Sequence, residues 1–148
     1  MSVSPGLIAD LKRDEGLRLK AYPDPLTRAD PWTCGYGHTG ADVCEDTVWT
    51  QEQCEAALIA DVEEVQRQLD AKLPWWRTLD PVRQDAVCNM AFNLGVAKLL
   101  TFSNTLAALK ARDYRRAAAS VMASRWAVQV GARSTRIAQM IVTGRRIP

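Results

Sequence analysis

Two carboxylic acids near the N-terminus, Glu15 and Asp24, are the residues whose types and spacing best suit chemistry. Glu15 follows Leu11 by four residues on the apolar face of a predicted helix, where lost hydration favours the protonated form of a carboxyl group. Asp24 lies in the proline-flanked segment Tyr22–Pro25. Such a pair suits glycosidic bond hydrolysis, because one carboxyl group can protonate the leaving oxygen while the other activates water or attacks the sugar.

Each acid also has a structural interpretation. A Glu at a helix end often belongs to an ion pair, and an Asp between prolines often hydrogen-bonds its own turn. Downstream, Thr33 offers a hydroxyl that could hold a water against Asp24, and the glycines of Thr33–Thr39 permit close approach of backbone or substrate. The combination, rather than either acid alone, favours a hydrolytic site.

Local signals predict the elements that position these residues. Ser4 is a helix cap before Pro5, and Gly16 is a terminator. Residues 17–49 are rich in Gly and Pro and predict a small sheet with loops. Thr50–Gln53 fits a capping box that begins a helix of roughly twenty residues, ended by Pro74.

Beyond residue 80, apolar residues recur at helical spacing in several segments, with Asp80 and Asp113 as caps and Gly95 as a terminator. The predicted fold class is α+β, mostly α. A small β-sheet lobe at about residues 17–49 is joined by a long helix at about 51–73 to a helical lobe at about 80–146. We expect residues 1–148 to form a single catalytic domain.

Charge is divided unevenly along the chain. Residues 1–74 carry a net charge of −7 and residues 75–148 a net charge of +9, and Lys110–Arg146 holds nine basic residues and one acid. This asymmetry suggests an anionic partner, attraction between the two halves, or a solvated basic face. Because no base-reading motif accompanies the basic residues, nucleic acid is not expected as the partner.

The four cysteines, Cys34, Cys44, Cys54 and Cys88, form no C-x-x-C pair, so a zinc site is not expected and neither is a cofactor. A disulfide between Cys44 and Cys54 is left open. The sequence has no apolar run of the roughly 20 residues that span a bilayer. Its N-terminus lacks a signal-peptide pattern, which predicts synthesis in the cytoplasm.

Two segments, Asp14–Asp24 and Thr33–His38, together resemble the phage-type lysozymes, or endolysins, of glycoside hydrolase family 24. Members of that family have Glu, Asp and Thr in this order, with Gly-x-Gly-His after the Thr. Segments that resemble the family also follow in the right order, namely Asn89–Gly95, Phe102–Leu106, Ser124–Trp126 and Thr143–Arg145. The resemblance covers about residues 7–146 and implies a lysozyme-like fold.

The resemblance implies that Glu15 is the general acid, Asp24 the base-side carboxylate and Thr33 the water-positioning hydroxyl of an inverting reaction. Asp30 competes for the carboxylate role, because the loop before Thr33 is longer than in the shorter family members. The resemblance further implies substrate-binding roles for Thr39, Phe92, Asn93 and Arg125, and supporting roles for Arg133, Arg136, His38 and Asp61. For Asn93 the alternative is a helix cap. His38 is expected to be structural and to pair with Asp61, rather than to touch the substrate.

The implied activity is that of an N-acetylmuramidase, which cleaves the β-1,4 bond between N-acetylmuramic acid and N-acetylglucosamine in peptidoglycan. The implied setting is a monomeric phage endolysin that waits in the host cytoplasm until a holin releases it to the periplasm and cell wall. A lytic transglycosylase, a tail-associated lysin and a bacterial effector remain alternatives. The length leaves no room for a separate wall-binding domain, and Trp49, Trp75 and Trp76 are expected to pack in the core.

Overall fold

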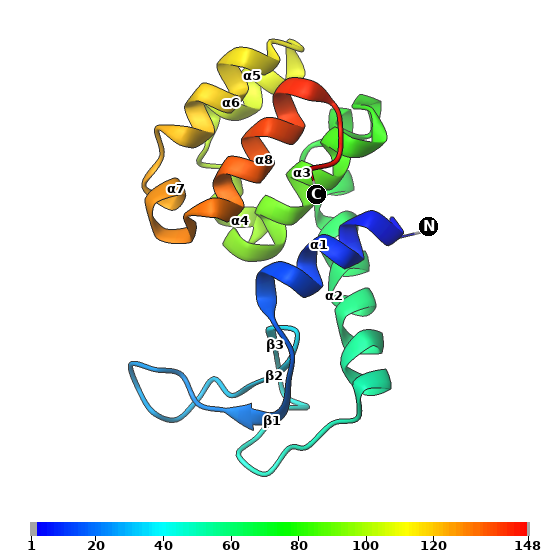
Figure 1. Cartoon of the computed structure of the whole chain (residues 1–148), viewed down its shortest axis with the longest axis vertical. Coiled ribbons are helices and arrows are strands. Elements are labelled where there is room, and N and C mark those ends of the chain that lie inside the picture. The colour runs from blue at the N-terminus through cyan, green and yellow to red at the C-terminus, as the bar shows by residue number, and fades with distance from the viewer. Residues whose placement is uncertain (1–2, 148) are drawn as a thin grey trace. The chain divides into compact units, whose positions relative to one another are not determined.

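The computed structural model describes residues 3–147, which divide between Glu64 and Val65 into two compact units. The first unit contains α1 (Pro5–Glu15), β1 (Arg18–Tyr22), β2 (Thr33–Gly35) and β3 (His38–Thr39) (Figure 1). Helix α2 (Gln51–Lys72) begins in the first unit and ends in the second. The second unit also contains η1 (Pro74–Thr78), α3 (Pro81–Leu94), α4 (Val96–Leu99), α5 (Ser103–Lys110), α6 (Tyr114–Met122), α7 (Arg125–Val130) and α8 (Ala132–Thr143). The predicted fold class, α+β and mostly α, is confirmed.

Helix α1 begins and ends where the sequence predicts. The Oγ atom of Ser4 accepts a hydrogen bond from the Leu7 amide at 3.3 Å, and Pro5 occupies the first turn, where its missing N–H costs nothing. Gly16 ends the helix with φ of 73°, a left-handed conformation that favours glycine. Because Leu7 and Leu11 are buried, the apolar face that ends at Glu15 is anchored.

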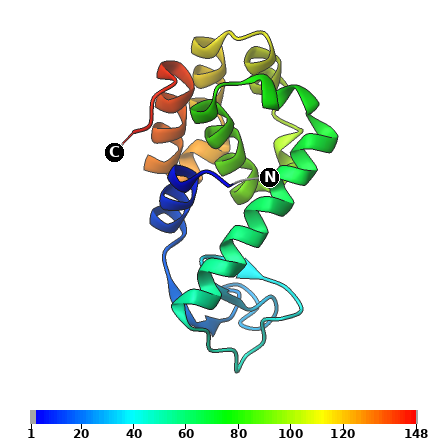
Figure 2. The same cartoon turned by 90° about the vertical axis from the view of Figure 1, so that its right-hand side faces the viewer.

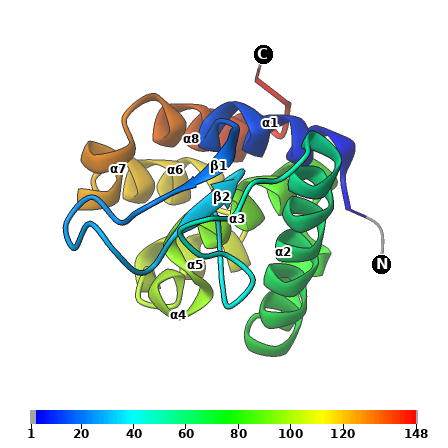
Figure 3. The same cartoon turned by 90° about the horizontal axis from the view of Figure 1, so that it is seen from below.

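The sheet is antiparallel, in the order β1-β2-β3. Figure 3 shows β1 and β2 side by side, with the connecting loop extending away from the strands. Beneath one face lies a small core of Ala21, Cys34 and Val43, against which Trp32 and Trp49 pack. This core fixes the strand register, since a shift of one residue would exchange the two faces.

Helix α2 is continuous over 22 residues (Figure 2). Its capping box is reciprocal, because the Thr50 amide donates to Oε1 of Gln53 at 2.8 Å and the Gln53 amide donates to Oγ1 of Thr50 at 3.2 Å. The helix stops at Lys72, ahead of Pro74. In η1, Trp76 is buried and its indole N–H donates to Asp70 at 2.8 Å, as expected of a packing residue.

In the second unit, α8 packs against α6, α3 and α7 (Figure 1). The predicted caps are confirmed, since Asp80 accepts from the Arg83 amide, Asp113 accepts from the Arg116 amide, and Gly95 ends α3. The short helices α4 and α7 were not predicted, because four and six residues are too few to show an apolar period.

All four cysteines are free thiols, and Cys44 is exposed while Cys34, Cys54 and Cys88 are buried. The disulfide between Cys44 and Cys54 that the sequence left open is therefore not formed. From residue 3 to residue 147, no helix is both long and apolar enough to cross a membrane.

Candidate active site

Glu15 is the last residue of α1 and is half-buried. One turn before it, the Nζ atom of Lys12 lies 2.6 Å from Oε1 of Glu55, which ties the end of α1 to α2. Gly16 then turns the chain directly into β1. The carboxyl group of Glu15 is thus held at a junction of helix and sheet, which matches its predicted place at a helix end.

The backbone of Gly37, in the turn between β2 and β3, lies against the carboxyl group of Glu15. A methyl group built on Gly37 would meet Oε1 of Glu15 at 2.6 Å, well inside van der Waals contact. Gly37 also has φ of 76°, so both its conformation and its surroundings favour glycine. The sequence predicted that backbone or substrate could come close to this glycine-rich segment. In the structure, the group that lies close to its backbone is the carboxyl group of Glu15.

Asp24 lies at the start of the loop between β1 and β2. Its Oδ1 atom accepts hydrogen bonds from the amides of Leu26 at 2.8 Å and Thr27 at 3.1 Å. The structural interpretation of this residue, an Asp that hydrogen-bonds its own turn, is thus correct for one carboxylate oxygen. Among residues 3–147, no group donates a hydrogen bond to Oδ2.

Thr33 begins β2 and is paired with Tyr22 on one side and Thr39 on the other. Residues directly opposite in antiparallel strands project to the same face, so Tyr22, Thr33 and Thr39 share one face of the sheet. Asp24 follows Tyr22 by two residues, so the strand register brings Asp24 and Thr33 to the same end of the sheet. Glu15 lies against Gly37 in the hairpin turn, beyond the opposite end of β2.

His38 pairs with Asp61, as predicted. Its Nδ1 atom lies 2.7 Å from Oδ2 of Asp61, and its ring lies 5.4 Å from that of Trp49. The sequence analysis missed a second partner, Asp42, whose Oδ1 is 3.0 Å from Nε2. The only sequence signal for this contact was the four-residue spacing of His38 and Asp42, with Gly40 between them. That spacing brings the two side chains together only because the chain turns at Gly40.

The pKa values of this trio move in different directions. Burial alone would lower the pKa of His38, but its hydrogen bonds to Asp61 and Asp42 outweigh burial and raise it. The pKa of Asp61 is raised chiefly by burial, which the hydrogen bond from His38 only partly offsets. The pKa of Asp42 is lowered by its hydrogen bond with His38. The attraction within the trio therefore favours a protonated His38. Asp61 is the acid whose charged form is disfavoured by burial.

In the second unit, Asn93 is exposed near the end of α3, with Phe92 half-buried beside it. Oδ1 of Asn93 accepts a hydrogen bond from the buried indole N–H of Trp126 at 2.7 Å. Gly95 ends the helix, so Asn93 is not the cap that the sequence offered as its alternative role. The Trp126 contact instead fixes the orientation of the Asn93 amide, a role the sequence did not reveal.

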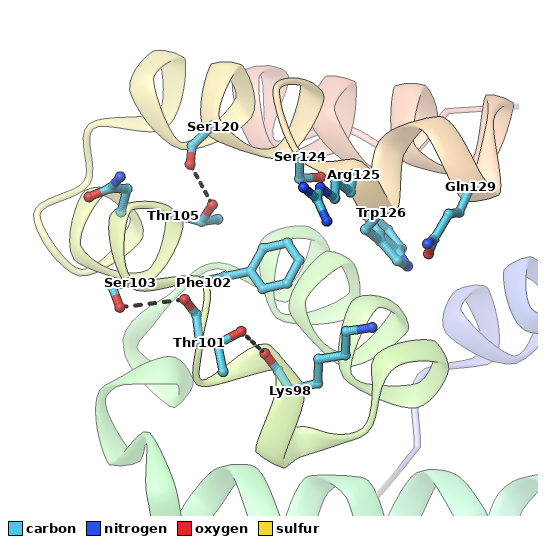
Figure 4. Close-up of a pocket in the computed structure, with 11 residues that line it drawn as sticks. Lys98, Thr101, Phe102, Ser103, Thr105, Ser120, Ser124, Arg125, Trp126 and Gln129 are labelled. Atoms are coloured by element: carbon cyan, nitrogen blue, oxygen red, sulfur yellow. Dashed lines mark hydrogen bonds between the residues drawn. The ribbon is translucent and has the colours of Figure 1, made fainter.

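Arg125 is exposed and lines a pocket of about 680 Å³. Figure 4 shows the Phe102 ring between the side chains of Arg125 and Trp126 and that of Lys98. Gln129 completes this side of the pocket. Of these residues, only Arg125 was predicted as a binding residue, because only spatial proximity connects α4, α5 and α7.

Arg133 is buried, and its Nε atom donates to Oδ1 of Asn89 at 2.9 Å, while Arg136 is half-buried. Both lie in α8, in the second unit. The supporting roles that the family resemblance implies for Arg133 and Arg136 stay a prediction. Across residues 3–147, no group of three or more His, Cys, Asp or Glu side chains is arranged so that it could hold a metal ion.

A mostly helical α+β chain, with an acid ending its first helix against the turn of a three-stranded sheet, has the fold of a lysozyme-type hydrolase. Comparison with known proteins agrees. Residues 12–146 match the family model described as Phage lysozyme, and the chain belongs to that family.

Several curated proteins are similar to the chain. An endolysin of Acyrthosiphon pisum secondary endosymbiont phage 1 is 39% identical over 122 residues, covering 82% of this chain and 79% of that protein. An endolysin of Salmonella phage P22 is 34% identical, covering 80% of each chain. The pre-baseplate central spike protein Gp5 of Enterobacteria phage T4 is 30% identical over 90% of this chain, which spans 27% of that protein.

Proposed function

We propose that this chain is an N-acetylmuramidase (EC 3.2.1.17) that lyses peptidoglycan as a phage endolysin. The bond cleaved would be the β-1,4 link from N-acetylmuramic acid to N-acetylglucosamine. Membership of the phage lysozyme family and the endolysin relatives support the lytic activity. The observation that best supports the proposed site is that Glu15 lies against Gly37. Thr33 and Asp24 lie toward the opposite end of β2.

In this proposal Glu15 protonates the glycosidic oxygen as the bond to the anomeric carbon breaks. Asp24 removes a proton from a water that Thr33 orients, and the water attacks the opposite face of the sugar. Inverting enzymes hold their two carboxyl groups about 6.5–9.5 Å apart to make room for that water. Glu15 and Asp24 lie toward opposite ends of β2, an arrangement that keeps the two carboxyl groups apart.

The residues proposed to bind the glycan are Thr39 of the sheet and three residues of the helical unit. Thr39 shares the sheet face with Thr33, while Phe92, Asn93 and Arg125 belong to the helical unit. The indole of Trp126 would keep the Asn93 amide N–H groups available to an acetamido or hydroxyl oxygen. Arg133, Arg136 and the His38–Asp61 pair would support the site without touching the bond that is cleaved.

The test is activity of purified variants on peptidoglycan sacculi. Glu15→Gln and Asp24→Asn should each lose at least 10³-fold in rate, while Asp30→Asn serves as the matched carboxylate control and should stay near wild type. Loss of activity in Asp30→Asn with retention in Asp24→Asn would transfer the base role to Asp30. Wild-type rates in Glu15→Gln would overturn the proposal.

Product analysis separates the mechanisms. An inverting hydrolase releases a reducing end as the α-anomer, which proton NMR detects before mutarotation. A lytic transglycosylase would instead leave a 1,6-anhydro sugar, and a retaining enzyme would release the β-anomer.

The similarity to Gp5 supports a tail-associated lysin as the second candidate. An endolysin would act as a monomer and depend on a holin for access to the wall. Expression in a host cell should therefore lyse the culture only with a co-expressed holin. Lysis without a holin, or incorporation of the chain into tail structures, would favour the alternatives.

A further inference from the structure

The loop that follows Asp24 is organised around that residue. Besides the two amides bound to Oδ1, the Asp24 amide donates to the Ala29 carbonyl at 3.1 Å, and the Asp24 carbonyl accepts from the Arg28 amide at 2.7 Å. Both carboxylate and backbone of Asp24 are therefore tied to the next five residues. The position of the carboxylate depends on the shape of this loop.

Thr27 holds the loop in that shape. Its amide is one of the two donors to Oδ1 of Asp24, at 3.1 Å. Its hydroxyl donates to the Asp30 carbonyl at 2.8 Å and accepts from the Ala29 amide at 3.2 Å. Arg28, next along the chain, has φ of 58°, a conformation that non-glycine residues rarely adopt without local support. One exposed side chain thus connects the Asp24 turn to the far end of the loop.

The hydrogen bonds distinguish the two oxygens of Asp24. Oδ1 accepts from two amides, which occupy it and fix the plane of the carboxylate. That arrangement leaves Oδ2 to accept a proton from water. Asp30 enters the network through its carbonyl oxygen, as a member of the loop.

We propose that Thr27 is a positioning residue for Asp24, and that Oδ2 of Asp24 is the oxygen that acts on the substrate water. The inference rests on the proposed function, since it assumes that Asp24 is the base-side carboxylate. Losing the hydroxyl would let the loop and carboxylate move. Because a misplacement of about 1 Å can cost about 10²-fold in rate, partial loss of order should lower kcat by about tenfold.

The experiment compares Thr27→Val, which keeps the shape and backbone amide but removes both hydroxyl bonds, with Thr27→Ser, which restores the hydroxyl. Thr78→Val is the matched control, because the Thr78 hydroxyl donates to the Trp75 carbonyl at 2.6 Å in the other unit. kcat and KM are measured on soluble peptidoglycan fragments. Thr27→Val is also combined with Asp24→Asn, and thermal unfolding checks that each variant is folded.

We expect Thr27→Val to lower kcat about tenfold with KM within twofold, and Thr27→Ser and Thr78→Val to stay within twofold of wild type. In the Asp24→Asn background, Thr27→Val should cause no further loss, because the group it positions is gone. If Thr27→Val does not fold, Thr27→Ala replaces it. A wild-type kcat in Thr27→Val would overturn this inference. So would a roughly tenfold loss of kcat when Thr27→Val is added to Asp24→Asn. In either case, an inactive Asp24→Asn would leave the proposed function intact. A fully active Asp24→Asn would instead refute the proposed role of Asp24.

Discussion

Replacing Gly37 by Ala should disable the enzyme mainly by moving the carboxyl group of Glu15. The added methyl would lie 2.6 Å from Oε1 of Glu15, whereas ordinary contact begins at 3.4 Å. Relief therefore requires a shift of about 0.8 Å. At about 10²-fold in rate for a misplacement of 1 Å, we expect activity to fall about 30- to 100-fold.

The same change strains the backbone, because Gly37 has φ of 76°. Such strain costs about 1–3 kcal/mol in unfolding free energy. Gly131→Ala is the control, since Gly131 has φ of 58° and a methyl there would meet no atom within 4 Å. Strain alone would thus affect stability in both variants and activity in neither.

The assay pairs initial rates of peptidoglycan turbidity loss with thermal unfolding of the same preparations. Gly37→Ala should be less active than the wild type even at temperatures well below its unfolding temperature, where it is folded. Gly131→Ala should be destabilised about as much as Gly37→Ala but should keep the wild-type rate. If Gly37→Ala retained more than half of wild-type activity, the contact with Glu15 would not control the position of the acid. Equal loss of activity in both variants would attribute the effect to general destabilisation.

Three further predictions concern stability, binding and thiol reactivity. Because the pKa of His38 is raised, the stability that it contributes should be present below pH about 6.5 and lost as pH rises through its folded pKa. In urea unfolding from pH 5 to 9, the unfolding free energy of the wild type should therefore approach that of His38→Gln. On the acid side, the lowered pKa of Asp42 predicts a contribution lost as pH falls below about 3.8, and a difference independent of pH would contradict both. Trp126→Phe removes the hydrogen bond to Asn93 and should lower the unfolding free energy by about 1 kcal/mol. It should also raise KM, because the Asn93 amide is no longer held in place. An unchanged KM would exclude Asn93 from substrate binding. Cys44 should react with Ellman's reagent in the folded protein, whereas the three buried thiols should react only after unfolding. Burial raises the pKa of Cys88 to about 12, which disfavours its reactive thiolate. Rapid reaction of all four thiols would show that the buried ones are accessible.

In the folded chain, Asp61 does not behave as the acid of a simple ion pair with His38. A His38–Asp61 pair by itself suggests that protonating Asp61 in acid would destabilise the fold. Burial instead raises the pKa of Asp61, so its protonated form is favoured in the folded chain and its ionisation costs stability as pH rises. Asp42, which the sequence did not reveal, carries the acid-side loss.

Much of the local structure could be predicted because its signals lie within a few residues of each other. Ser4, Pro5 and Gly16 define α1, and the Thr50–Gln53 box begins α2, through backbone hydrogen bonds that close within one helical turn. Short helices such as α7 escaped prediction, since their apolar residues are too few to establish a period.

By itself, the sequence determined the family, the helix ends and the candidate acids, because residue type and spacing carry that information. The tertiary structure decided what surrounds those acids. Gly37 meets Glu15 only after the hairpin folds back toward α1, and Lys12, one turn before Glu15, meets Glu55 only where α1 lies against α2. Such contacts join residues from separate turns and strands, and their geometry arises from packing that no local pattern encodes.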